Sequence, residues 1–435
     1  MGTHLRGCVL IAVLSLGFLA SATVSANRIS QDAAILFYQR KLQRSPHDAL
    51  TYFKLGDAYI QKARENGDIA FVNLAEQALQ KSLELDPQNS GALRHLAYVL
   101  YYRHAFEDAA IDAGKAVKAD PTDGNAYGIM GDAYQETGKY RQARQAYQAM
   151  MKIKRDLYAY SRSSGSRSLR GDTQGAMMDL EKAIREGKTS ECPSESIAWV
   201  QWQLANEYFA LGKIAQADFW QCEALKTYPD YFRALAGLAQ VRTAQQRFPE
   251  AIELYKKAIA IIPFPEYATA LGDIYLKIGQ VEESRKQFEL VEYIGQLNTL
   301  NKILYNRGLA YFYADHDIKI EESLKMAKEE FKVRKDIYGY DVLAWTLYKN
   351  GSSKEAAAAV SRALELGTKD ANLFFHAGMI YHRLGDTTKS RHYLRRALLT
   401  NPHFHIFHAD VARTTLKKLD EQPSRSVKKE ESGGA

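Results

Sequence analysis

The chain has 435 residues, of which 46% are hydrophobic and 25% are charged, and these values exclude a wholly disordered protein. Its 10 prolines and 28 glycines exclude a collagen-like or linker-dominated chain. The formal net charge of +7 comes from 58 basic and 51 acidic residues spread along the chain without a basic block, so no nucleic-acid partner is predicted.

Residues 1–26 have the pattern of a signal peptide. Arg6 precedes an apolar run from Cys8 to Ala22, and Val24-Ser25-Ala26 offers small residues suited to cleavage. The run is shorter than the roughly 20 residues that a membrane-spanning helix needs, although an uncleaved anchor stays as an alternative. We therefore expect an exported protein, periplasmic or secreted, without stable membrane insertion after removal of the leader.

The mature chain begins with a predicted capping helix within residues 27–48, where Ile29 to Arg44 has an amphipathic pattern. From Ala49 onward a 34-residue period recurs, and positions are counted from the first helical residue of each repeat. The eighth position is always small: Gly56, Ala97, Gly131, Ser164, Ala205, Ala239, Gly272, Ala310, Ala344 and Gly378. The twentieth position is also always small: Ala75, Ala109, Ala143, Ala176, Ala217, Ala251, Ser284, Ser323, Ala356 and Ser390.

Paired small residues let two antiparallel helices approach closely, so each period predicts one helical hairpin that crosses at these positions. Prolines stop second helices, for example after Asp86 and Asp120, because proline cannot continue a helix. Glycines mark the turn inside a repeat, where a left-handed backbone is expected: Gly138, Gly212, Gly279, Gly351 and Gly385.

These residues carry a family resemblance. The pattern Leu-Gly-x-x-Tyr, then a small residue, then proline resembles the tetratricopeptide repeat, and its first part is clearest in Leu271-Gly272-Asp273-Ile274-Tyr275. Other strings, such as Phe375-His376-Ala377-Gly378-Met379 and Asn401-Pro402-His403-Phe404, resemble a group of bacterial exported tetratricopeptide proteins of unassigned function. The resemblance implies an all-α, right-handed α-solenoid of about ten helix-turn-helix repeats. The expected order is repeats one to three at 49–156, a degenerate repeat four and loop at 157–196, repeats five to ten at 197–402, a capping helix at 403–419 and a disordered tail at 420–435.

Repeat four is the weakest repeat. Its first helix would contain the string from Ser161 to Ser168, which has little apolar surface to bury, and a polar loop from Gly187 to Ser196 follows its second helix. Two interpretations stay open, a soft joint that divides the solenoid and a degenerate but ordered repeat. Cys192 and Cys222 are expected more often as unpaired thiols than as a disulfide, because the register separates them.

No motif of catalysis or of phosphate binding is found, and the chain is predicted to be neither an enzyme nor dependent on a cofactor. Histidines are concentrated near the carboxyl end, and His403, His405 and His408 are spaced so that they could bind one metal ion. A capping region whose histidines pack or face solvent is the favoured interpretation, so no metal site is predicted.

The first helices of stacked hairpins line a hollow side, exposing roughly positions two, five, six, nine, twelve and thirteen. Aromatic and amide side chains at these positions predict a groove for a protein or peptide, because tyrosine and tryptophan give large contact areas at low conformational cost. The predicted partner-binding residues are Arg94, Tyr98, Tyr101, Tyr102, Trp199, Trp202, Asn206, Phe209, Gln240, Trp345, Tyr348, Phe375 and His376.

The predicted function is a non-catalytic exported scaffold whose hollow side recognises this partner. Binding of a carboxyl-terminal chaperone peptide is not expected, because no three consecutive repeats supply the lysine, asparagine and arginine set of that clamp. The alternative function is a polysaccharide-associated component of an envelope export or assembly machinery, since aromatic rows also stack on sugar rings. Both functions assume an open curved rod with an accessible hollow side.

Overall fold

The computed structural model describes residues 31–300 and 307–421, and it describes the side chains of residues 31–297 and 307–421. The predicted signal peptide and the predicted tail beyond residue 421 lie outside the described residues. The described residues form 22 α-helices and no strand. None of these helices is both long enough and apolar enough to cross a bilayer.

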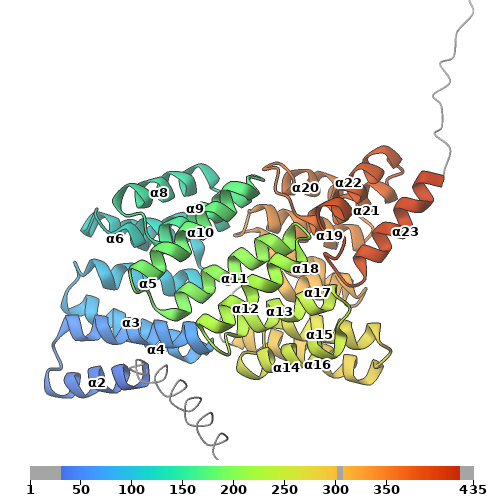
Figure 1. Ribbon diagram of the computed structural model, residues 1–435. Helices are drawn as coiled ribbons and strands as arrows, with labels where there is room; N and C mark the ends of the chain where they lie inside the picture. Colours follow the sequence, from blue (N-terminus) through green and yellow to red (C-terminus); the bar gives the residue numbers. More distant parts are fainter. Residues whose placement is uncertain (1–30, 301–306, 422–435) are drawn as a thin grey trace, which may run out of the picture. The chain divides into compact units, whose positions relative to one another are not determined.

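The helices follow one another as antiparallel hairpins (Figure 1). Their bounds are α2 (Gln31–Arg44), α3 (Ala49–Asn66), α4 (Ile69–Leu85), α5 (Ser90–Tyr102), α6 (Phe106–Ala119), α7 (Gly124–Glu136), α8 (Tyr140–Ile153), α9 (Leu157–Ser168), α10 (Thr173–Thr189), α11 (Ser194–Ala210), α12 (Ile214–Thr227), α13 (Phe232–Ala244), α14 (Phe248–Ile261), α15 (Pro265–Lys277), α16 (Val281–Leu300), α17 (Arg307–Asp315), α18 (Ile320–Phe331), α19 (Ile337–Lys349), α20 (Ser353–Ala363), α21 (Ala371–Arg383), α22 (Thr387–Thr400) and α23 (His408–Glu421).

The chain divides into two compact units, residues 1–96 and residues 97–435, which are called unit one and unit two. In unit one, α2 packs on the hairpin of α3 and α4. Ile35 and Leu42 are its buried residues, and the Gln39 amide donates to the Tyr59 hydroxyl at 2.9 Å. Repeat one, from Ala49 to Asn89, is seven residues longer than the 34-residue period, and its two helices are 18 and 17 residues long.

Asp48 caps α3 in unit one. Its carboxylate accepts from the backbone N–H and the hydroxyl of Thr51, and the pKa of Asp48 is lowered to about 2 by these bonds and by the nearby ammonium of Lys41. We expect Asp48→Ala to lower the free energy of unfolding by about 1 kcal/mol at pH 7. Because the folded pKa is lower than that of the unfolded chain, the capping contribution is present above about pH 4 and is lost as the pH falls toward 2.

Urea unfolding at pH 7 and at pH 3 checks this prediction, with Asp48→Asn as the control. An asparagine cap retains the hydrogen bond without the titrating charge, so this variant should show a weaker dependence on pH than the wild type. Equal stability of Asp48→Ala and the wild type at pH 7 would contradict the capping role.

The hairpins of unit two confirm the burial of the small positions and correct how the helices meet. Every residue at positions eight and twenty is buried. A Cβ added at Gly131 would meet the Tyr147 ring at 2.5 Å, and one at Gly378 would meet Leu394 at 2.6 Å. Tyr147 and Leu394 stand at position 24, so the glycine makes room for a large side chain of the second helix rather than for a second small residue.

The turns inside the repeats confirm the expected left-handed backbone. The φ angles of the five predicted glycines lie between +68° and +89°, a region that L side chains rarely adopt. Cys192 and Cys222 are both free, as favoured by the register, and burial raises the pKa of each thiol.

Repeat four forms both of its helices, α9 and α10. Side-chain hydrogen bonds take the place of the missing apolar surface of α9: Ser161 donates to Gln203 at 3.0 Å, and Ser163 donates to Asp179 at 2.7 Å. The predicted polar loop is shorter than expected, because α10 continues to Thr189 and α11 begins at Ser194. The helical structure agrees with the ordered interpretation, whereas the mobility of a soft joint stays a prediction.

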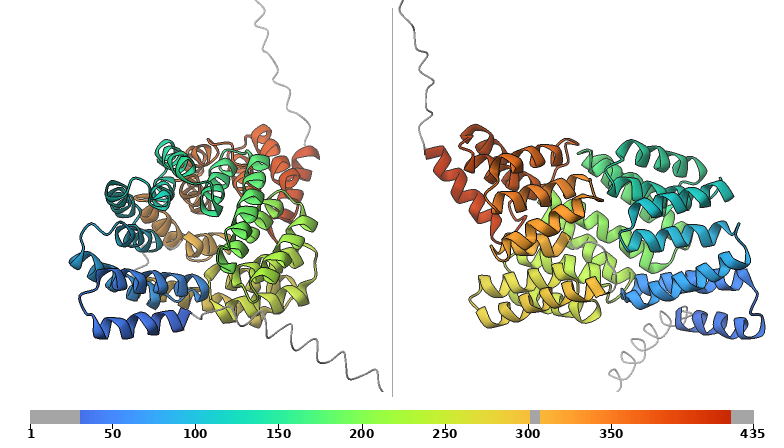
Figure 2. Two further views of the ribbon diagram at one scale, coloured as in Figure 1. Left: turned by 60° about the vertical axis from the view of Figure 1, so that its left-hand side comes forward. Right: turned by 180° about the vertical axis from the view of Figure 1, so that it is seen from behind.

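The expectation of an open rod is wrong for unit two, because its early repeats contact its late repeats. The turns of repeats three, four and five lie against the loops that precede α19, α21 and α23, and Figure 2 shows the green and orange helices side by side. Four hydrogen bonds or ion pairs join residues about 200 positions apart: Glu136 with Arg334, Ile337 N–H with the Tyr140 hydroxyl at 2.7 Å, Thr368 with the Leu169 carbonyl at 2.5 Å, and the Asn401 amide with the Phe209 carbonyl at 2.8 Å.

Candidate functional site

The closure of unit two leaves a cavity of about 400 Å³ on the inner side. The inner helices α11, α13 and α15 form three of its walls, and the start of α21 with the segment after α22 forms the opposite wall. The lining residues are Trp202, Asn206, Phe209, Ala210, Arg233, Ala236, Gly237, Gln240, Tyr255, Glu266, Tyr267, Ala270, Asp370, Ala371, Asn372, Asn401 and Phe404, which we call the inner pocket.

The repeat register accounts for most of this pocket. All the lining residues of α11 and α13 occupy the predicted inner positions two, five, six, nine, twelve or thirteen. Trp202, Asn206, Phe209 and Gln240, which belong to the predicted partner-binding set, are thereby brought together. Regular stacking of hairpins carries the same helix face to the hollow side in each repeat.

Arg233 organises the aromatic part of the pocket. Its guanidinium lies 5.3 Å from the Trp202 ring centroid, 5.0 Å from that of Phe232 and 5.7 Å from that of Phe264. Stacking on several rings holds a guanidinium in place and leaves its N–H groups directed outward in its own plane. The pocket therefore presents a flat aromatic surface beside a fixed cationic donor.

Amide side chains supply hydrogen-bonding groups to the pocket. The carbonyl oxygen of Asn206 accepts from Gln221 at 3.2 Å, which orients the Asn206 amide nitrogen. Gln240 is exposed, and Asn372 of α21 also lines the cavity. Asparagine and glutamine offer both a donor and an acceptor, so these side chains can pair with a peptide backbone.

Two carboxylates complete the pocket. Glu266 is exposed inside the hollow, yet the surrounding protein raises its pKa by desolvation. Burial also raises the pKa of Asp370, whose side chain caps α21 by accepting from the Asn372 N–H at 2.8 Å. Beside Glu266, desolvation raises the pKa of Tyr267 to about 12. Glu266 is the more exposed of these two acids, whereas Asp370 is half-buried and engaged as a helix cap.

The predicted residues of repeats nine and ten are not open to a partner. Trp345 and Phe375 are each 2% exposed, His376 is 4% exposed and Tyr348 is 7% exposed. The segment after α22 covers them, since Phe375 stacks on the His408 ring at 4.6 Å between centroids. The sequence pattern gave no signal of this cover, because the histidines that provide it lie in the capping region.

The other predicted residues lie outside the inner pocket. Arg94 belongs to unit one and is half-buried. Tyr98, Tyr101 and Tyr102 belong to unit two and are half-buried, with the Tyr101 hydroxyl donating to Glu136 at 3.4 Å. Trp199 is half-buried against Leu204 and its neighbours in the core between α9 and α11.

Three functional candidates were missed by the sequence analysis, and two carried a signal. Arg233 and Glu266 both occupy position two of their repeats, so the register marks them as inner residues although neither is an aromatic or amide side chain. Asp370 precedes α21 and lies outside the inner positions. Its place in the pocket depends on the closure of unit two, which the period alone does not give.

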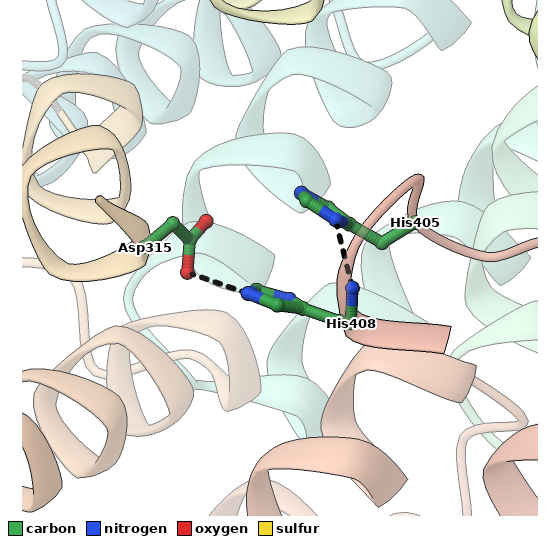
Figure 3. Close-up of side chains that lie close together, drawn as sticks. All are labelled: Asp315, His405 and His408. Atoms are coloured by element: carbon green, nitrogen blue, oxygen red, sulfur yellow. Dashed lines mark hydrogen bonds and ion pairs between the residues drawn. The ribbon is translucent and has the colours of Figure 1, made fainter. Parts of the chain in front are cut away.

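One group of side chains in the described residues has the composition of a metal site. Figure 3 shows Asp315, at the end of α17, beside His405 of the segment that precedes α23 and His408, the first residue of α23. One potential ligand atom of each residue lies within 4.8 Å of the other two.

Family models of the tetratricopeptide repeat match several segments of the chain. One tetratricopeptide repeat model matches residues 203–268 and 342–403, and a second matches residues 124–157. These segments include repeats three, five, six, nine and ten of the period described above. The helical hairpins observed in each matched segment have the fold that the match implies.

Curated relatives match part of the chain. A CTR9 homolog of Arabidopsis thaliana is 27% identical over 196 residues, 42% of this chain and 17% of the relative. A TPR repeat-containing protein of Methanocaldococcus jannaschii is 28% identical over 116 residues, 25% of this chain and 20% of the relative. The chain thus spans about a fifth or less of the length of these relatives.

Among solved structures, a human IFIT1 dimer with PPP-AAAA aligns with a TM-score of 0.45 and 17% identity, covering 81% of this chain and 80% of IFIT1. The 34-residue period, the stacked hairpins and the family-model matches together assign the fold. The chain contains tetratricopeptide repeats at residues 124–157, 203–268 and 342–403, and its described residues form an all-α solenoid fold.

Proposed function

We propose that the chain is an exported scaffold that binds an extended segment of a partner protein in the inner pocket of unit two. Tetratricopeptide repeats typically form non-catalytic scaffolds that bind protein or peptide partners. Export is supported by the leader pattern of residues 1–26. The observation that carries the proposal is the convergence of Trp202, Arg233 and Gln240 on one cavity.

The chemistry of the pocket favours a peptide. A cavity of about 400 Å³ accommodates one or two side chains of a ligand, not a folded domain. The ring of Trp202 offers an apolar contact surface, while Asn206 and Gln240 offer donors and acceptors to a peptide backbone. Glu266 adds a carboxylate that would pair with a basic side chain of the partner.

Binding should depend on the pocket and not on aromatic side chains elsewhere. We expect Trp202→Ala to weaken partner binding at least tenfold, since truncation of a central aromatic anchor commonly costs 2 kcal/mol or more, about thirtyfold in affinity. Phe219→Ala is the matched control, because Phe219 is an aromatic residue of the outer helix α12 that is 56% exposed. Its affinity should equal that of the wild type.

The measurement has two arms. The purified protein is used to capture proteins from an envelope extract, and each captured protein is then titrated against wild type, Trp202→Ala and Phe219→Ala with melting curves recorded in parallel. The same protein is applied to a glycan array. Retained binding by Trp202→Ala would reject the pocket, and saturable glycan binding that Trp202→Ala abolishes would favour the polysaccharide-associated role instead.

A further inference from the structure

We propose that Asp315, His405 and His408 form a binding site for a divalent transition metal of the Zn²⁺ or Co²⁺ type. The site joins α17 to the segment that begins α23, and it lies outside the inner pocket (Figure 3). The sequence analysis predicted no metal site. It could not place a carboxylate beside the histidines, because Asp315 lies about 90 positions before His405 in the chain.

The first argument is the hydrogen bonding of His408, which is 8% exposed. Its Nδ1 atom is buried without a hydrogen-bond partner, and its Nε2 atom lies 3.7 Å from an Asp315 oxygen, longer than a hydrogen bond. A buried imidazole normally has a partner on at least one nitrogen, because an unsatisfied polar group costs free energy. A metal ion between His408 Nε2 and Asp315 would give the ring a partner on Nε2.

The second argument is the charge of Asp315. No lysine or arginine among the described residues forms an ion pair with this carboxylate, and its hydrogen-bond donor is the indole N–H of Trp345 at 2.7 Å. A divalent cation would neutralise the carboxylate in place, and the Trp345 bond would hold it in a fixed orientation.

The third argument is the arrangement of the two imidazoles. The rings of His405 and His408 stack at 4.0 Å between centroids, and one potential ligand nitrogen of each lies within 4.8 Å of the other. Behind them, Asp273 lies 3.9 Å from His405 Nε2 and accepts from His316 at 2.8 Å. This second carboxylate can orient a ligating ring or approach the ion itself.

Metal binding requires a local adjustment of the rings. Ligand atoms of a four-coordinate zinc site lie roughly 3.3–3.5 Å apart, whereas the atoms here lie within 4.8 Å and the two rings stack at 4.0 Å between centroids. In addition, His405 Nδ1 accepts from the backbone N–H groups of Phe407 and His408 at 3.2 and 3.3 Å. Ligation through Nε2 puts the proton on Nδ1, so the metal competes with these two long contacts.

The test is titration of the purified full-length protein with Co²⁺ and with Zn²⁺. We expect one equivalent of Co²⁺ to give the visible absorption of a four- or five-coordinate ion, displaceable by Zn²⁺, and we expect Zn²⁺ to raise the melting temperature. Asp315→Asn and His408→Gln should each weaken binding by about tenfold or more. The matched control is His382→Gln with His392→Gln, since both of these histidines are exposed.

The outcomes are distinct. Wild-type protein that gives no saturable Co²⁺ signal, or a signal lost in the control and retained in Asp315→Asn, overturns the proposal. If a site variant fails to fold, X-ray absorption of the wild-type protein loaded with one equivalent of Zn²⁺ decides the matter. Two imidazole ligands and an oxygen support the site, and a spectrum without imidazole ligands overturns it.

Discussion

Gly138→Ala and Gly171→Ala are expected to be among the most destabilising single-methyl additions in this protein. Both glycines lie in turns of unit two with φ near +72°, and both touch backbone across its closure. A Cβ at Gly138 would overlap the Lys335 carbonyl oxygen, and one at Gly171 would lie 2.5 Å from the Gly367 carbonyl oxygen. A backbone carbonyl cannot rotate away as a side chain can, so the contact between early and late repeats must open.

The matched controls are Gly279→Ala and Gly385→Ala. These glycines have φ of +81° and +76°, and a Cβ at either would meet nothing within 4 Å. In the controls, left-handed backbone strain alone should lower the free energy of unfolding by about 1–2 kcal/mol. In Gly138→Ala and Gly171→Ala, the steric overlap should lower it by about 2 kcal/mol more. Urea unfolding measures the difference, and equal losses in both pairs would show that the turns do not meet the late loops in solution.

Arg334→Met is expected to cost about 3–5 kcal/mol of the free energy of unfolding. Arg334 comes from the loop before α19 and forms ion pairs with Glu136 of α7 and with Glu330, which is 2% exposed. Arg307 pairs with Glu330 at 2.7 Å in the same network. Removing the Arg334 guanidinium leaves Glu136 and Glu330 with too little positive charge in a site that excludes water.

The pH dependence identifies the cause of this loss. Burial raises the pKa of Glu136 even with Arg334 present, and without the guanidinium that pKa rises further above its value in the unfolded chain. The folded variant then binds a proton that the unfolded chain does not, so its deficit should shrink as the pH falls from 8 to 5. Lys332→Met, which removes an exposed pair with Glu329, is the control and should cost no more than about 1 kcal/mol.

A deficit in Arg334→Met that stays constant between pH 8 and pH 5 would point to lost packing rather than to unpaired charge. The double variant Arg334→Met with Glu136→Gln adds a second check. Because it removes one of the stranded carboxylates, it should be more stable than Arg334→Met alone at pH 8.

The sequence predicted the repeat, its turns and the inner face of each first helix. The residue at position eight, such as Gly131, is always small because a large side chain of the second helix, such as Tyr147, packs against it. Because the period is regular, Trp202 and Gln240 could be placed on one surface before any coordinates were known.

The closure of unit two could not be predicted from the period. Closure depends on small rotations between successive hairpins, which accumulate over five repeats and are not encoded in any single position. Its contacts use ordinary loop residues such as Lys335, Thr368 and Asn401. Trp345 and Phe375 are buried at inner positions because the segment after α22 covers them through the His408 ring.

The order of repeat four also required the structure. Hydrophobic patterning cannot identify a serine that forms a hydrogen bond with a neighbouring helix. Ser168 is such a residue, because its hydroxyl donates to Glu207 of the next repeat at 3.0 Å. Arg162 likewise pairs with Asp132 of the preceding repeat at 2.9 Å. These polar contacts between repeats are specific to their partners and follow no period.

Site-specific photo-crosslinking at residue 240 tests the central claim, that a partner segment occupies the inner pocket. A photoreactive side chain replaces exposed Gln240 inside the pocket or, in the control, exposed Gln216 on the outer helix α12. The account predicts that position 240 captures one envelope protein through a short peptide, that Trp202→Ala abolishes this product, and that position 216 gives none. Capture of the same protein from position 216, or an undiminished product at position 240 in Trp202→Ala, would contradict it.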